Sequence, residues 1–340
     1  MQRRMITLTL ALGLVLMFVS SAAMAQYQLT NLVSNQVGKA VHIDPLLVNG
    51  WGLVYAPGSP WWISDAGSGW STLYNRFGTK VPLNVAVPSA NGKGAGSPTG
   101  IVFNGSTEFK VSGSPAVFLF ATLDGTISGW APGVNPNAAI IAVNNSSSGA
   151  VYTGLAITSN ASGNLIFASD IANNKVDVYD GTFTWVTSFT DPTIPVGFAP
   201  FNVQDLNGLL YVAFAAQDEG PGGYIDIYSE AGVWLKRLAQ GTPLNHPWGF
   251  AAAPSAFGTL SNTLLISNNT PNGAINAFNA VTGEFVGAVK QSGKPIAIDG
   301  LWGIEFGGGT ANNGAKNELF FTAGPSGYQA GTFGVIRIVP

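Results

Sequence analysis

The sequence predicts an all-β fold, a six-bladed β-propeller with four antiparallel strands per blade. Two observations carry this prediction: a short phrase that returns six times, and a constant order of strand-like runs after each copy. A third observation, a spare strand near the N-terminus, shows how the ring of blades would close.

The repeated phrase is an aromatic residue or threonine, then glycine, then an aliphatic residue or phenylalanine. Successive copies lie 47 to 54 residues apart, which matches the length of a propeller blade, about 40–50 residues. The copies are centred on Gly52, Gly100, Gly154, Asn202, Gly249 and Gly303, so that asparagine replaces glycine once. In a propeller these first strands line the central channel, where close approach of backbones favours residues without a side chain.

Further strand-like runs follow each copy. The second run is apolar, as at 61–64 and 210–215, and the third alternates with period two, as at 175–179 and 224–228. A fourth run completes most units, for example 185–189. Four short strands per unit with no helical period indicate a propeller; a pair of β-sandwiches would instead show a break in composition, which is not visible.

The sixth unit ends in its third strand, at 335–338, and lacks a fourth. A spare strand at 27–33 precedes the first unit, and we expect it to pair with 335–338. This pairing would close the ring and hide an edge that otherwise invites aggregation.

The N-terminus has the features of an export signal. Arg3 and Arg4 precede an apolar run at 6–19, and Ala23-Met24-Ala25 forms a small-x-small cleavage site. The run is short for a membrane anchor, which needs about 20 apolar residues. We therefore expect a signal peptide at 1–25, a single propeller domain at 26–340, a secreted or periplasmic bacterial protein, and no membrane span after processing.

Composition narrows the function classes. The formal net charge is −3, or −5 once Arg3 and Arg4 are removed, and only 9% of residues are charged. Without a basic stripe, nucleic acid is a poor candidate partner. The chain has no cysteine and two histidines, His42 and His246, and no Gly-x-Ser-x-Gly or His-Glu-x-x-His motif. Whether the protein is an enzyme stays open.

The first strands carry one polar set in an otherwise apolar channel: Asn202, Gln204 and Glu305. One interpretation is that they hold a divalent cation such as calcium, or orient a ligand. The other is a structural hydrogen-bond network with channel water, because buried polar groups are usually satisfied.

The top face is where the first strands begin and where the loops between second and third strands lie. Aromatic, amide and carboxylate groups gather there, and they suit stacking on sugar rings or other planar ligands. The candidate ligand-binding residues are Trp51, Tyr152, Phe201, His246, Trp248, Asp299, Trp302, Asp65, Asp170 and Asn268. The alternative is structural: the tryptophans would be wedges between blades, and the aspartates would cap turns.

Five phrases, spread over the whole mature chain, resemble a family of exported bacterial propellers without established activity, some of which carry a C-terminal PEP-CTERM sorting tail. The phrases are NLVS at 31–34, LVNGWGL at 47–53, DGTISGW at 124–130, APFNV at 199–203 and IDGLWG at 298–303. This sequence ends at Pro340 without such a tail, which favours free release. The six-blade plan is also similar to NHL-repeat proteins and to the gluconolactonase group, whose members hold a divalent cation in the channel.

These observations favour a binding or scaffold propeller that takes a small-molecule, carbohydrate-like or peptide ligand at its top face. The alternative is a metal-dependent hydrolase or lyase acting on a lactone or cyclic ester. Its metal would lie with Glu305 and Asn202.

Overall fold

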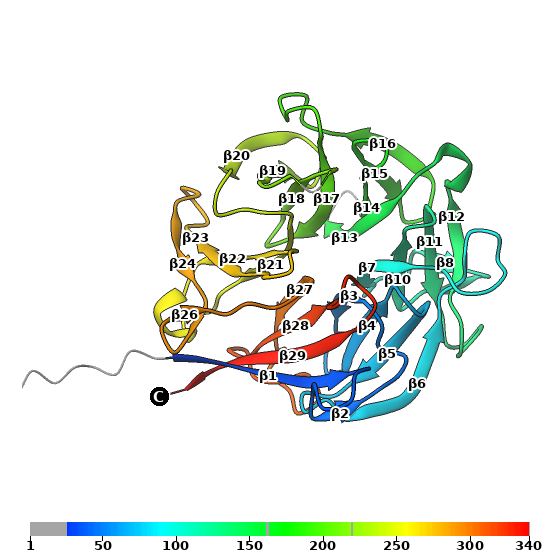
Figure 1. Cartoon of the computed structure of the whole chain (residues 1–340). Coiled ribbons are helices and arrows are strands. Elements are labelled where there is room, and N and C mark those ends of the chain that lie inside the picture. Colours follow the sequence, from blue (N-terminus) through cyan, green and yellow to red (C-terminus); the bar gives the residue numbers. More distant parts are fainter. Residues whose placement is uncertain (1–25, 161–162, 219, 340) are drawn as a thin grey trace, which may run out of the picture.

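The structure, a computed structural model, describes residues 26–160, 163–218 and 220–339. Six antiparallel sheets are arranged around one axis, with their first strands converging at the centre (Figure 1). The predicted six-bladed propeller with four antiparallel strands per blade is confirmed.

The first three blades follow one another in chain order. Blade 1 consists of β3 (Gly50–Val54), β4 (Trp61–Asp65), β5 (Trp70–Tyr74) and β6 (Lys80–Ala86). Blade 2 consists of β7 (Pro98–Phe103), β10 (Phe118–Thr122), β11 (Thr126–Trp130) and β12 (Ile140–Asn144). Blade 3 consists of β13 (Tyr152–Asn160), β14 (Gly163–Asp170), β15 (Lys175–Asp180) and β16 (Trp185–Phe189).

The second half repeats the plan and ends in the composite blade. Blade 4 consists of β17 (Phe198–Asp205), β18 (Leu209–Ala216), β19 (Tyr224–Ser229) and β20 (Trp234–Gln240). Blade 5 consists of β21 (Pro247–Ala252), β22 (Leu264–Asn268), β23 (Ile275–Phe278) and β24 (Phe285–Ala288). Blade 6 consists of β27 (Leu301–Phe306), β28 (Leu319–Ala323), β29 (Thr332–Val339) and β1 (Gln26–Ser34).

Short elements decorate the connections. They are β2 (His42–Ile43), the hairpins β8 (Lys110–Val111) with β9 (Ser114–Pro115) and β25 (Lys290–Gln291) with β26 (Lys294–Pro295), and the 3₁₀ turns Ser146–Ser148 and Gly258–Leu260. The β8–β9 hairpin lies between the first and second strands of blade 2, which makes that unit longer than its neighbours.

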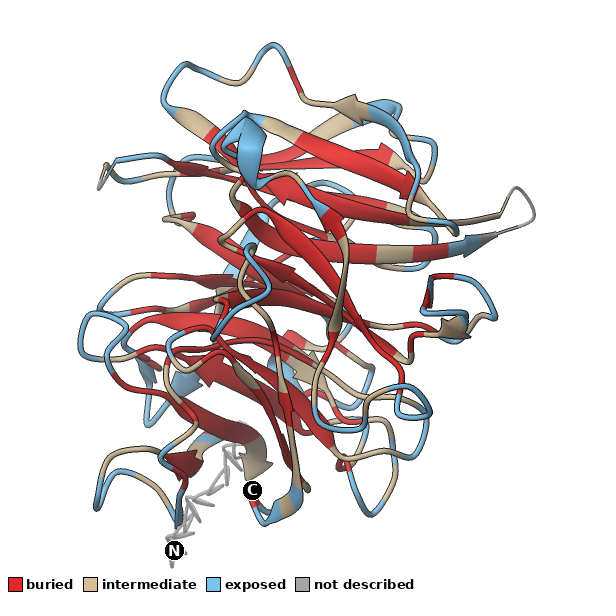
Figure 2. Cartoon of the chain, turned by 90° about the vertical axis from the view of Figure 1, so that its right-hand side faces the viewer, coloured by how far each residue is buried: buried red, intermediate tan, exposed pale blue. Residues whose placement is uncertain are grey.

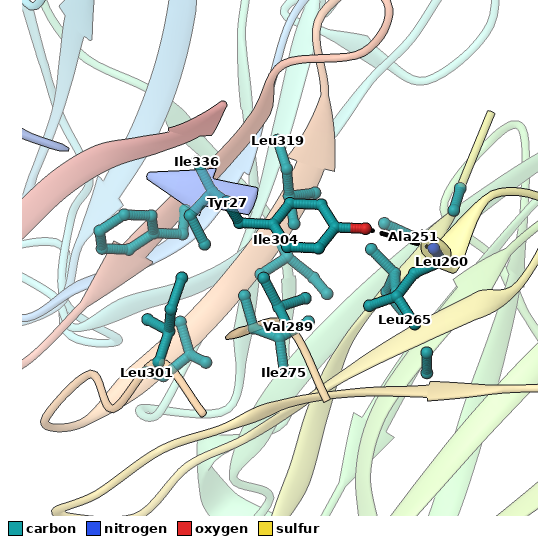
Figure 3. Packing of buried hydrophobic residues seen from close by; sticks show 14 of the residues in the cluster. Tyr27, Ala251, Leu260, Leu265, Ile275, Val289, Leu301, Ile304, Leu319 and Ile336 are labelled. Carbon is teal, nitrogen blue, oxygen red and sulfur yellow. Dashed lines mark hydrogen bonds between the residues drawn. The ribbon is translucent and has the colours of Figure 1, made fainter. Parts of the chain in front are cut away.

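The N-terminal strand closes the ring as expected. β1 runs antiparallel to β29, with Tyr27 opposite Ile338 and Leu29 opposite Ile336, and the two strands lie side by side in Figure 1. The Tyr27 hydroxyl donates to the Phe257 carbonyl at 2.8 Å and accepts from Leu260 N at 3.2 Å (Figure 3). The outer strand of blade 6 is thereby fastened to blade 5.

The core lies between the blades. Among the described residues, each pair of neighbouring blades shares one cluster of buried apolar side chains, because the apolar faces of adjacent sheets pack together. Trp61 and Phe320, for example, join blades 1 and 6, while Phe167 and Phe214 join blades 3 and 4. Buried positions therefore run through the inner strands of each blade, and exposed ones lie in the loops and the outer strands (Figure 2).

The recurring glycines lie where neighbouring first strands approach each other. A Cβ at Gly100 would lie 2.4 Å from the Leu155 nitrogen, and one at Gly52 would lie 2.5 Å from the Thr99 oxygen. At Gly154 it would lie 2.7 Å from the Asn202 Cα. The side chain is absent because the next blade occupies its space.

Within the described part of the chain, no helix has the length and apolarity needed to span a membrane. The expected signal peptide at 1–25 lies outside the described residues.

Candidate functional site

An aromatic layer crosses the central channel. It consists of Trp51, Phe201, Trp248 and Trp302, which come from the first strands of blades 1, 4, 5 and 6. Trp51 stacks on Trp302 with ring centroids 3.6 Å apart, and Trp248 meets Trp302 edge-on at 6.0 Å. All four rings are buried, so the layer separates the two mouths of the channel.

Above this layer lies the larger cavity, the top basin, with a volume of about 810 Å³. Trp51, Phe201 and Trp302 form its floor, and loops between second and third strands form its wall. His246 and Asp299 also line it, so the structure brings together five of the ten predicted ligand-binding residues.

The polar rim of the top basin is held in place by its own hydrogen bonds. His246 Nε2 lies 3.1 Å from the Asp218 carbonyl oxygen, and Nδ1 lies 3.0 Å from Asn245 Oδ1. Asp299 is exposed and accepts a hydrogen bond from Ser326 N at 2.9 Å. Asn49 Oδ1 accepts from the Trp302 indole at 2.8 Å, which fixes one ring of the floor.

Two wall residues were missed by sequence reasoning. Tyr328, 42% exposed, packs its ring 5.5 Å from Trp302, and its hydroxyl donates to Asn269 Oδ1 at 2.7 Å. Both residues line the basin. Tyr328 belongs to the loop between β28 and β29, the second and third strands of blade 6. The corresponding loops of other blades supplied candidates in the sequence analysis, so the repeat was the signal that could have found Tyr328.

Tyr152 and Trp248 do not line the top basin. Tyr152 is fully buried between blades 2 and 3, where its hydroxyl lies 3.0 Å from Asp177 and 2.8 Å from the Tyr179 hydroxyl. The Trp248 indole donates to the Thr153 carbonyl at 3.0 Å, and Trp248 lines the space on the other side of the aromatic layer.

Asp65, Asp170 and Asn268 also lie away from the basin lining, at the ends of second strands. Asp170 accepts from Val151 N at 3.0 Å and from the Asn173 amide at 2.7 Å. Asn268 accepts from Asn245 N at 3.1 Å and donates to the Pro243 carbonyl at 2.7 Å. Asp65 is fully buried, and burial raises its pKa well above the ordinary value. These contacts organise the loops that form the rim.

Below the aromatic layer lies a second space, the channel cavity, with a volume of about 290 Å³. Asn202, Gln204 and Glu305 all line it. The Asn202 amide donates to the Trp248 carbonyl at 2.8 Å. Gln204 donates to the Phe250 carbonyl at 3.0 Å and accepts from Phe250 N at 3.3 Å, so both amides join blade 4 to blade 5.

Other blades form comparable bonds with different side chains. Thr99 donates to the Tyr152 carbonyl at 2.8 Å, and Ser267 donates to the Trp302 carbonyl at 2.6 Å. In each case the acceptor is a carbonyl at or directly before the start of the next repeat phrase. Asn202 therefore performs in blade 4 the joining role that hydroxyl groups perform in blades 2 and 5.

Glu305 differs from the two amides. It makes no side-chain hydrogen bond or ion pair with any residue that the structure describes, and burial raises its pKa to about 8. The Tyr55 pKa is raised to about 12 by burial and by the charge of Glu305. Within the described ranges no group of three or more histidine, aspartate or glutamate residues could hold a metal ion.

Comparisons with known proteins agree with the fold. The search against protein-family models found no match. Among solved structures, a Bacteroides thetaiotaomicron protein of unknown function covers 92% of this chain and 76% of its own, with a TM-score of 0.56 and 10% identity. A streptogramin B lyase covers 93% of this chain and 98% of its own, with a TM-score of 0.55 and 10% identity. At such identities the likeness extends to the propeller fold alone.

Sequence relatives come from Acanthamoeba polyphaga mimivirus. The "Uncharacterized protein L690" is 29% identical over 305 residues, covering 83% of this chain and 79% of the relative. The "Uncharacterized protein R648" is 31% identical over 323 residues, covering 88% of this chain and 78% of the relative. These relatives are viral, whereas the resemblance described above was to bacterial proteins. The chain belongs to the protein family that includes the mimivirus protein R648.

Proposed function

We propose that this propeller is a binding protein whose top basin takes a neutral, hydroxyl-rich, carbohydrate-like ligand. The observation that carries the proposal is the composition of that cavity: an aromatic floor, one exposed aromatic side chain, and a rim of amides and carboxylates. Apolar rings with a few well-placed polar groups are typical of small-molecule sites.

The charge of the lining favours a neutral ligand over an acidic one. Asp218 and Asp299 line the basin, and no lysine or arginine of the described ranges does. Sugar hydroxyls can donate to these carboxylates, whereas a phosphate or sulfate group would meet negative charge without a counter-ion.

Tyr328 is the side chain best placed for stacking. The rings of the floor are no more than 8% exposed, whereas Tyr328 is 42% exposed and its orientation is set by Asn269. A sugar ring placed against Tyr328 would bury apolar C–H groups while its hydroxyls reach the rim.

Binding is also better supported than metal-dependent hydrolysis. Gln204, one of the expected metal ligands, uses both its amide atoms on Phe250 of blade 5, and His246 has a partner within hydrogen-bond distance of each ring nitrogen. The lyase among the similar structures supports the fold only.

The test is a glycan array followed by calorimetric titration of the best neutral oligosaccharide. Tyr328→Ala is expected to weaken binding by at least ~tenfold, because it removes an aromatic anchor of the site. Trp234→Ala removes an aromatic side chain of 48% exposure from outer strand β20 and is the matched control. Equal affinity of Tyr328→Ala and wild type, selective binding of peptides, or loss of binding with a chelator would refute the proposal.

Export is proposed on the sequence features of the first 25 residues. Expression in a bacterial host with a secretory pathway, followed by N-terminal sequencing of the exported protein, is expected to give a chain that begins at Gln26. Retention of the intact N-terminus on the cytoplasmic side would contradict this proposal.

A further inference from the structure

The channel cavity contains an acid without a protein partner. Glu305 lies in β27, is half-buried, and faces a space bounded by the first strands of the other blades. A carboxylate partly removed from water is costly unless a positive charge, hydrogen-bond donors or a proton compensates it. Among the described residues the carboxyl forms no hydrogen bond or ion pair, so a partner for its ionised form must come from outside the protein.

The walls restrict what can supply it. Among the described residues no lysine, arginine or histidine lines the channel cavity, and its surface is about half polar and half apolar, with aliphatic side chains such as Ile101, Val102 and Ile157 on the apolar part. At about 290 Å³ the cavity is at the lower limit of small-molecule sites, which span about 300–1,000 Å³. It suits a short hydrocarbon body that carries one positively charged group.

The remaining polar groups argue against a metal ion. A hard divalent cation needs six or more oxygen ligands; the Gln204 oxygen already accepts from Phe250 N, and the side-chain oxygens of Asn202, Asp205 and Glu305 in the lining are fewer than six. An ammonium group requires less, because one carboxylate and an aromatic ring can stabilise it. Tyr55 also lines the cavity, so a carboxylate and an aromatic side chain are both present in the lining.

We infer that the channel cavity is a binding site for a small organic cation, an alkylammonium whose positive group pairs with Glu305 and whose hydrocarbon part contacts the aliphatic walls. This site is independent of the top basin. The two cavities share no lining residue, and the aromatic layer of Trp51, Phe201, Trp248 and Trp302 lies between them.

Binding should be coupled to proton release. Among the described residues the titratable groups that line the cavity are Tyr55, directly after β3, Asp205 of β17 and Glu305 of β27, while β7, β13 and β21 contribute none. With a pKa raised to about 8, Glu305 is mostly protonated at neutral pH in the empty protein. A cation that pairs with the ionised form must displace that proton.

The test is calorimetric titration of the full chain with n-butylammonium chloride near neutral pH, in two buffers that differ in ionisation enthalpy. We expect saturable binding with release of close to one proton per ligand, and at least ~tenfold weaker binding of the uncharged analogue n-butanol. Glu305→Gln, which preserves side-chain size, should lose at least ~tenfold in affinity for n-butylammonium. Glu284→Gln removes one exposed negative charge from blade 5 and controls for net charge.

Each contrary outcome overturns the inference. These outcomes are no saturable binding by wild type, equal affinity in Glu305→Gln, no proton release, or calcium binding that depends on Glu305. Melting temperatures of both variants verify that they fold. Tyr328→Ala, which tests the top basin, should leave n-butylammonium binding intact, so failure of one site is distinguishable from failure of the other.

Discussion

Gly100 illustrates how single residues determine this ring. Its missing side chain leaves room for the backbone of Leu155 in the next blade, and Gly52 does the same for Thr99. Where blade 4 carries Asn202 in the equivalent position, the amide forms a hydrogen bond to the neighbouring blade. The same position of the repeat thus allows neighbouring backbones to approach closely where it is glycine, and forms a hydrogen bond between blades where it is Asn202.

Gly100→Ala should destabilise the protein by about 1–3 kcal/mol, since the added methyl group would overlap the Leu155 nitrogen at 2.4 Å. Gly133→Ala is the matched control, because a Cβ there meets nothing within 4 Å. Denaturant unfolding of both variants measures the difference. Equal stabilities would mean that neighbouring first strands are farther apart than described.

Glu305 predicts a pH dependence of stability. Burial raises its pKa in the folded state from the ordinary 4.5 to about 8, so the folded protein holds a proton that the unfolded chain has lost between these values. Its contribution to the free energy of unfolding should therefore fall as pH rises from about 4.5 to about 8.

Melting temperatures of wild type and Glu305→Gln, recorded across this range, measure that contribution. The melting temperature of Glu305→Gln should fall less than that of wild type as the pH rises. Near pH 8 the variant should therefore be more stable than wild type. Parallel curves for the two proteins would show that Glu305 stays ionised at neutral pH.

Residue patterns predicted part of the candidate site. The aromatic residues beginning the repeat phrases were correctly placed around the axis, and Trp51, Phe201 and Trp302 line the top basin. Tyr152 was wrongly grouped with these rings. It lies one residue before the position that Thr153 occupies in blade 3, and successive side chains of a strand point to opposite faces, so Tyr152 is buried between blades.

At the scale of elements, the N-terminal strand has the largest single consequence. β1 supplies the outer strand of blade 6, and Tyr27 extends this contact to blade 5. Sequence alone predicted the pairing, because an incomplete sixth unit and an unassigned first strand complement one another. It did not predict the Tyr27 bond, since the acceptor lies 230 residues away in an irregular loop.

Tyr27→Phe should lower the free energy of unfolding by about 1–3 kcal/mol. The ring stays in place, but the Phe257 carbonyl and the Leu260 N–H lose their buried partner. Tyr211→Phe is the control, because its hydroxyl forms no hydrogen bond among the described residues. Comparable losses in both variants would show that the contact between β1 and blade 5 contributes nothing measurable.

At the scale of the whole molecule, the propeller has two separate cavities on one axis. The aromatic layer divides them, with a larger polar-rimmed basin above and a smaller cavity below whose lining is about half polar. The number of blades and the direction of the channel followed from the repeat. The repeat did not predict that the channel is divided into two cavities, because the division depends on how rings from four different blades stack.

A crystal structure of the protein with the best neutral oligosaccharide from the array tests the account most directly. We predict ligand density in the top basin, in contact with Tyr328 and on the side of the aromatic layer away from Glu305. Density of the sugar in the channel cavity, on the outer strands, or nowhere on the protein would contradict the account.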